Sequence, residues 1–114
     1  SMVVCRFTNF AWTVDDYADM VAAGTGLPID GKKLLRIGSR IWNLERLFNI
    51  REGFSKKDDA LPPRFSTPLP EGGSRNRIAK IDVMLPEYYS LREWDKEGNP
   101  TDKVLKDLNI PIER

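Results

Sequence analysis

Few side chains in this sequence have the type and spacing that could support chemistry. The clearest are the thiol of Cys5, the only cysteine, and the adjacent carboxylates Asp58 and Asp59. A thiol can ligate a metal or an iron–sulfur cluster, and paired carboxylates can act as acid and base when burial separates their pKa values. Nothing nearby predicts burial of both carboxylates. We therefore interpret them as structural residues that cap a turn or pair with Arg51 or Arg64.

Cys5 has two main interpretations from the residues alone. A lone cysteine is most often a small, buried and inert thiol. The alternative is one ligand of a metal centre whose other ligands lie outside this chain, because an iron–sulfur cluster needs four ligands. A thiol-dependent redox protein ranks last, since Arg6 is the only neighbouring residue that would activate the thiol.

The composition excludes several classes of protein. The chain has 114 residues and no histidine, which removes Ser–His and Cys–His nucleophile pairs and every metal site that contains histidine. It has no phosphate-binding glycine motif. A net charge of +1 gives no electrostatic reason to expect nucleic-acid binding. No apolar run approaches the roughly 20 residues that a bilayer crossing needs. No signal peptide is expected, and the single cysteine fits a cytoplasmic location.

The spacing of apolar residues predicts an all-α fold. We expect about four helices in an irregular bundle, with a long proline-rich loop between the second and the third, in a single domain covering residues 1–114. Pro86 is tolerated only in a first turn, which would place the start of the third helix at Asp82 or later. Thr13 and Asp16 form a capping-box pattern. The expected helices span about residues 13–24, 30–51, 81–94 and 101–108, followed by a short tail over residues 110–112.

The second helix is expected to be buried on a wide face. Its apolar stripe recurs at steps of three or four residues: Leu34, Ile37, Ile41, Leu44 and Phe48. Three further residues widen the stripe: Leu35, Trp42 and Leu47. This width predicts packing against two neighbours. Gly38 in mid-helix costs about 1 kcal/mol relative to alanine, which predicts a close approach of another backbone at that position.

Basic residues occupy the polar side of the same helix. A solvated face is the simpler interpretation, and a docking surface for an acidic ferredoxin is the alternative. The residues concerned are Lys32, Lys33, Arg36, Arg40 and Arg46.

Other large apolar side chains are expected in the core. The tryptophans Trp12, Trp42 and Trp94 are interpreted as core residues. The third helix is expected to turn one apolar face inward, made of Met84, Leu85, Tyr88, Leu91 and Trp94. In the loop over residues 54–77, the apolar side chains expected to pin the loop to the helices are Leu61, Phe65 and Leu69.

The whole pattern resembles the C-terminal segment of the tungsten-containing aldehyde:ferredoxin oxidoreductase family, and the resemblance covers nearly the entire chain. The stretches that carry it are Val3-Val4-Cys5, Asp16-Tyr17, Gly24-Thr25-Gly26, residues 40–46, Arg51-Glu52-Gly53-Phe54, residues 57–62, Met84-Leu85-Pro86-Glu87-Tyr88-Tyr89 and Trp94-Asp95.

The resemblance gives Cys5 and Val4 specific roles. In this family a 4Fe–4S cluster is held by an early Cys-x2-Cys-x3-Cys group and one distant cysteine, which closes an Asp-x-x-x-x-Cys motif that contacts the pterin. The resemblance implies that Cys5 is this fourth cluster ligand and that the backbone of Val4 contacts the pterin. The aspartate of the motif would stand just before Ser1. No catalytic residue carries over.

The resemblance also implies a function. The parent enzyme would oxidise an aldehyde to a carboxylate at a tungsten bis-pterin centre and pass two electrons through the 4Fe–4S cluster to ferredoxin. Its partners would be the rest of the parent enzyme, ferredoxin and the aldehyde, with no nucleic acid and no membrane. The segment alone is expected to bind no cofactor and to be inactive. The alternative is a free-standing helical interaction module that recruits a partner through its proline-rich loop.

Overall fold

The computed structural model describes residues 2–111, and over these residues the protein is helical. Within that range no strand forms, and only two isolated β-bridges occur, Leu69 with Arg75 and Trp94 with Pro100. The all-α class and the number of long helices are therefore as predicted. The helices are α1 (Val14–Thr25), α2 (Gly31–Arg51), α3 (Ile81–Leu91) and α4 (Asp102–Asp107), with short 3₁₀ turns at Arg6–Phe10, Lys56–Asp58 and Pro63–Ser66.

The helix starts are set by side-chain caps. Thr13 and Asp16 form the predicted capping box of α1, which satisfies backbone N–H groups that have no partner inside the helix. The Asp30 carboxylate accepts a hydrogen bond of 2.7 Å from the backbone N–H of Lys33 at the start of α2. Thr101 caps α4 by accepting from Val104. These local contacts explain why three of the four starts could be predicted from the sequence.

The third helix starts where its apolar pattern predicts, but the position of Pro86 and the end of the helix differ from expectation. It begins at Ile81, so Pro86 lies inside the helix rather than in its first turn, and it ends at Leu91 instead of continuing to Trp94. Proline has no N–H to donate to the carbonyl four residues earlier. The Pro86 ring is exposed, which leaves room for this local defect. The predicted tail after α4 reaches Ile112, which lies outside the described residues, as does Ser1.

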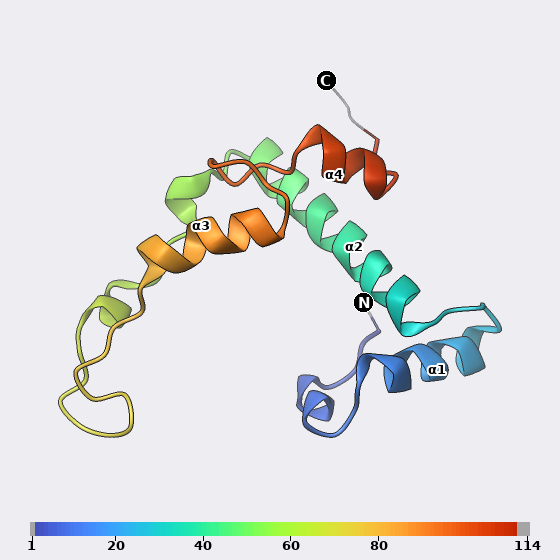
Figure 1. Ribbon diagram of the computed structural model, residues 1–114, viewed down its shortest axis with the longest axis horizontal. Coiled ribbons are helices and arrows are strands. Elements are labelled where there is room, and N and C mark those ends of the chain that lie inside the picture. The colour runs from blue at the N-terminus through green and yellow to red at the C-terminus, as the bar shows by residue number, and fades with distance from the viewer. Residues whose placement is uncertain (1, 112–114) are drawn as a thin grey trace.

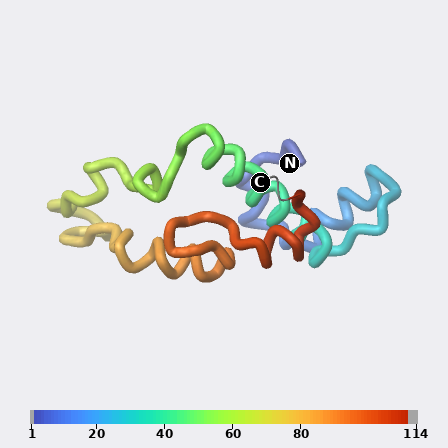
Figure 2. The backbone as a smooth tube through the Cα atoms, turned by 90° about the horizontal axis from the view of Figure 1, so that it is seen from above, coloured from blue at the N-terminus to red at the C-terminus, as the bar shows by residue number. Residues whose placement is uncertain are grey.

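The chain forms an open arch rather than a closed bundle (Figure 1). α1 and the 3₁₀ turn before it make one limb, and the loop between α2 and α3 makes the other. The tube in Figure 2 shows that the arch is also flat, with extents of 52 × 42 × 22 Å. The radius of gyration is 17.7 Å, whereas a compact domain of this length would have about 13 Å.

The apolar core is small and lies near the C-terminal end of the described chain. Leu47 of α2 packs against this cluster, which consists of Val104, Leu105, Leu108 and Ile110. At the other end α1 packs against α2, and Ala18 on its predicted inner face is buried. Trp94 is the one tryptophan in the core; Trp12 and Trp42 are substantially exposed, so their prediction as core residues is wrong for this chain.

Several predicted burial sites are open in the structure. The three proposed loop anchors are all exposed, and so are Met84 and Leu91 of α3. A Cβ added to Gly38 would meet no atom within 4 Å, so no other backbone segment among residues 2–111 approaches it closely. These expectations are wrong within the chain because the arch supplies no layer to cover these positions. No helix of the described residues is both long and apolar enough to cross a bilayer.

Candidate functional site

Cys5 adjoins the N-terminal end of the α1 limb. It immediately precedes the 3₁₀ turn Arg6–Phe10, and its carbonyl accepts hydrogen bonds from the Thr8 backbone N–H at 3.1 Å and hydroxyl at 2.6 Å. The Cys5 thiol is exposed, which overturns the interpretation of a buried, inert cysteine. The described residues contain no group of three or more side chains that could hold a metal ion. Any cluster at Cys5 would therefore need ligands from elsewhere.

Val4 adjoins this thiol and is also uncovered. Among residues 2–111 its backbone N–H and carbonyl take part in no hydrogen bond, and its side chain is exposed. Phe7, two residues beyond Cys5, is exposed as well. The thiol, the Val4 side chain and the Phe7 side chain are thus all exposed within the described residues.

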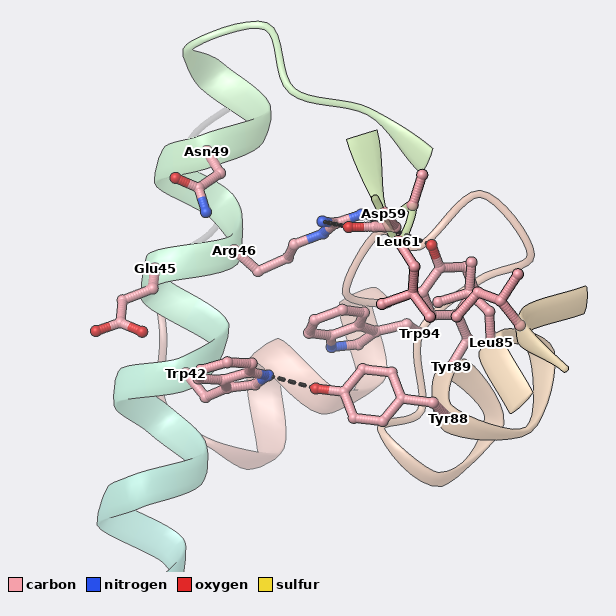
Figure 3. A pocket seen from close by; sticks show the side chains of 12 residues that line it. Trp42, Glu45, Arg46, Asn49, Asp59, Leu61, Leu85, Tyr88, Tyr89 and Trp94 are labelled. Atoms are coloured by element: carbon pink, nitrogen blue, oxygen red, sulfur yellow. Dashed lines mark hydrogen bonds and ion pairs between the residues drawn. The ribbon is translucent and has the colours of Figure 1, made fainter. Parts of the chain in front are cut away.

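A second group of polar residues, unlike Cys5, is built entirely within this chain. Arg46 reaches from α2 to the loop and binds the Asp59 carboxylate through both terminal nitrogens, at 2.7 and 2.6 Å (Figure 3). Its Nε donates to the carbonyl of Gly98 at 2.9 Å, and its guanidinium carbon lies 5.1 Å from the centre of the Trp94 ring. Arg46 is only 8% exposed, so its prediction as part of a solvated face is wrong.

Tyr89 of α3 completes this cluster. Its hydroxyl donates to the same carboxylate of Asp59, and the residue is buried. Gly98 leaves the necessary space, because an added Cβ would lie 2.6 Å from Arg46 Nη2 and 2.7 Å from Tyr89 Cζ. The cluster of Arg46, Asp59, Tyr89 and Gly98, here called the arginine cluster, joins α2, the loop, α3 and the turn before α4.

The two adjacent carboxylates of the loop have separate structural roles. Asp58 caps the 3₁₀ turn by accepting from the Ser55 backbone N–H at 2.7 Å, as the turn-cap interpretation predicts. Asp59 does pair with an arginine, but the partner is Arg46 and neither Arg51 nor Arg64. The two side chains do not act as an acid–base pair.

At the arginine cluster, burial and the neighbouring charges shift the pKa values of Asp59 and Arg46 in opposite directions. Burial raises the pKa of the Asp59 carboxyl, but the hydrogen bonds from Arg46 and Tyr89 and the guanidinium charge outweigh it, so the pKa falls below its usual value. Burial lowers the pKa of Arg46, yet the Asp59 contacts raise it overall. Burial, followed by the hydrogen bond to Asp59 and its charge, raises the pKa of Tyr89 to about 12. All three groups are thereby held in their neutral-pH protonation states, so none is prepared to transfer a proton.

A cavity of about 370 Å³ opens beside the cluster, between α2, the loop and α3. One wall carries a hydrogen bond of 2.7 Å from Trp42 Nε1 to the Tyr88 hydroxyl (Figure 3). Leu61 and Leu85 contribute apolar walls. Behind the cavity Trp94 Nε1 donates to the buried Asn43 side chain at 2.8 Å. No buried side-chain N or O in the described residues lacks a hydrogen-bond partner, and the exposed side chains of Glu45 and Asn49 also line the cavity.

Sequence reasoning missed most of this cluster. Tyr89 and Gly98 were not singled out, and Arg46 was placed on the wrong face. One signal was available, because Asn43 and Arg46 are three residues apart on one side of α2 and so share a face. Their partners, more than ten residues away in each case, have no local pattern that links them to α2.

Comparison with known proteins accounts for the open arch. The family model described as aldehyde ferredoxin oxidoreductase, domains 2 and 3, matches residues 1–110. The chain belongs to the aldehyde ferredoxin oxidoreductase family. It is 42% identical over 109 residues to the tungsten-containing aldehyde ferredoxin oxidoreductase of Pyrococcus horikoshii and 41% identical to that of Thermococcus kodakarensis, in each case over 94% of this chain. It spans only 18% of the length of these relatives.

The segment also resembles parts of enzymes that are named for other substrates. The chain is 30% identical to the WOR-like subunit of an aliphatic sulfonate oxidoreductase from Pyrococcus furiosus, over 96% of this chain and 19% of that protein. It also superposes on a solved structure of the active-site complex BamBC of benzoyl coenzyme A reductase, with a TM-score of 0.69 and 30% identity. That match covers 87% of this chain and 14% of the other. The segment is thus a part common to enzymes named for different substrates.

Proposed function

We propose that this chain is the C-terminal helical segment of a cytoplasmic enzyme that oxidises aldehydes to carboxylates at a tungsten–pterin centre. Electrons would pass through a 4Fe–4S cluster to ferredoxin. The single observation that carries the proposal is the family match over residues 1–110, in a chain that spans 18% of its relatives. The segment acts as scaffold and contributes one cluster ligand.

The local structure at Cys5 fits that ligand role. Thiolates are the usual ligands of iron–sulfur clusters, and the Cys5 thiol is exposed on an apolar surface that the rest of the enzyme would cover. The uncovered peptide group of Val4 fits a backbone contact with the pterin. When bound, the tungsten–pterin group supplies the redox chemistry; this chain supplies Cys5, Val4 and the arch that positions them.

The open arch favours this proposal over a free-standing interaction module. A module that folds alone must bury most of its large apolar side chains. Here exposed apolar residues occur on the α1 limb, α2, the loop and α3, and the radius of gyration exceeds that of a compact domain. A module would also need a gene that encodes only this domain. The enzyme proposal requires upstream codons for Cys-x2-Cys-x3-Cys and for an aspartate just before Ser1.

The proposal is tested with the full-length enzyme and a Cys5→Ser variant. The variant should fold and retain tungsten but lose the electron paramagnetic resonance signal of the reduced cluster and ferredoxin-linked turnover. The matched control is Thr8→Val, which changes a neighbouring polar side chain without removing a thiol. An unchanged cluster signal in Cys5→Ser would refute the ligand role. The isolated segment should bind no tungsten, and aldehyde oxidation by it would refute the scaffold role.

A further inference from the structure

α2 has two faces of the kind that proteins usually bury. The described chain covers only one of them. The covered face carries polar residues, Asn43 and Arg46, that are buried against α3, the loop and the turn before α4. The other face carries the stripe Ile37, Ile41, Leu44 and Phe48, whose spacing of three and four places all four on one side. Ile37, Leu44 and Phe48 are exposed, Phe48 by 55%.

This arrangement is inverted relative to an ordinary surface helix, which buries its apolar residues and exposes its polar ones. Burying side chains of this kind stabilises a protein, because it removes apolar surface from water. An apolar stripe three turns long, opposite a face that is already packed, is expected of a helix in the interior of a protein. The stripe runs along α2, which at 21 residues is the longest helix of the described chain.

Gly38 lies beside this stripe and has no role within the chain. A glycine in a helix interior is less favourable than alanine, and an added Cβ here would meet nothing within 4 Å among the described residues. Small residues at a contact allow two elements to approach at the short end of the usual packing distances. Gly38 and the stripe together therefore mark a surface on which another element crosses closely.

We infer that this face of α2, formed by Ile37, Gly38, Ile41, Leu44 and Phe48, is covered by the upstream part of the same polypeptide. The inference rests on the proposed function, which places this segment at the C-terminal end of its enzyme, and on the 82% of the relatives' length that this segment does not span. A second copy fits less well. One self-complementary patch would cover one surface, whereas exposed apolar residues occur on all parts of the arch.

The test uses the full-length enzyme and measures the accessibility of single positions by thiol labelling, with peptide mass spectrometry to separate the introduced thiol from native cysteines. Leu44→Cys and Ile41→Cys report on the stripe, and Glu52→Cys at the exposed end of α2 is the matched control. We expect labelling of the stripe variants to be slower than that of the control by about 100-fold or more, because it requires local opening. Gly38→Leu in the Leu44→Cys background should abolish this protection.

Equal labelling at positions 44 and 52 in an enzyme that retains its tungsten would overturn this inference while leaving the proposed function intact. Protection that disappears on dilution, together with a change from dimer to monomer in gel filtration, would assign the face to a second copy and would also overturn it. A gene without upstream coding sequence would instead refute the proposed function itself.

Discussion

Arg46 on α2 and Asp59 in the following loop form a two-point ion pair, with N–O distances of 2.7 and 2.6 Å, at a site where Arg46 is almost fully buried. A planar guanidinium matches a carboxylate in this geometry. Since Arg46 also donates to Gly98, this one side chain connects α2 to the loop and to the turn before α4. The first three predictions concern this connection in the full-length enzyme.

Replacing Asp59 by asparagine should release the elements that Arg46 joins. The buried guanidinium would lose its counter-charge, and breaking one partner of a buried pair typically costs about 3–5 kcal/mol. Because Asp59 is partly exposed, we expect about 2–3 kcal/mol less stability against local opening. Hydrogen exchange of α4 amides measures this quantity. Asp58→Asn, which affects only a turn cap, is the control, and equal protection in the two variants would contradict the prediction.

The same pair predicts weaker α4 protection in acid. The pKa of Asp59 is lowered in the fold, so the unfolded state takes up its proton first as the pH falls. The stabilisation is complete above the unfolded pKa of about 4 and is lost as the pH falls through the folded value. Hydrogen exchange of α4, compared between wild type and Asp59→Asn, should converge in acid. A constant difference at every pH would show that the Asp59 charge is irrelevant.

The contribution of Tyr89 to stability should be lost at alkaline pH, whereas that of Asp59 is lost in acid. The pKa of Tyr89 is raised to about 12, so its neutral hydroxyl stabilises the fold fully below about pH 10, and this contribution is lost as the pH rises toward 12. Ultraviolet absorbance of tyrosinate should show one late-ionising tyrosine that Tyr89→Phe removes. If Tyr89→Phe leaves the late phase in place, the hydroxyl that ionises late belongs to another tyrosine.

Gly98→Ala should disrupt the arginine cluster by steric overlap. The added Cβ would lie well inside contact distance of Arg46 and Tyr89, and Gly98 has a φ of 80°, which side chains rarely adopt. We expect a loss of about 2–4 kcal/mol in local stability. The control is Gly53→Ala, where φ is 95° but nothing lies within 4 Å, so only backbone strain of about 1–2 kcal/mol applies. The overlap argument requires the Gly98 variant to be clearly the less stable of the two.

The sequence allowed good prediction of what depends on near neighbours. The capping boxes and the apolar periodicity gave α1 and α2 within a residue or two, and the family resemblance rested on short stretches of chain. The arginine cluster was not predictable in this way, because Arg46 acquires its partners from residues 13 and 52 positions away. Local pattern alone makes an arginine between apolar residues look solvated.

The wrong burial predictions have a different cause. Large apolar residues such as Phe48, Trp42 and Leu61 usually lie in a protein core, but in this structure they are exposed. Hydrophobic periodicity reports that a face is buried in the mature protein but does not say which chain covers it. Gly38 is the same case, since its predicted close neighbour is absent from this chain. The burial predicted for these residues is expected in the parent enzyme rather than in the segment alone.

The position of Gly98 has a consequence for the order in which the protein assembles during translation. Arg46 is synthesised 52 residues before the carbonyl that it binds there, and Tyr89 also follows it. Synthesis runs from the N-terminus, so a nascent chain carries Arg46 and its counter-charge Asp59 well before the Tyr89 hydroxyl and the Gly98 carbonyl emerge. Premature termination just before Gly98 would leave α1, α2 and α3 encoded, but α4 would be missing and Arg46 would lack its carbonyl acceptor in the turn before α4.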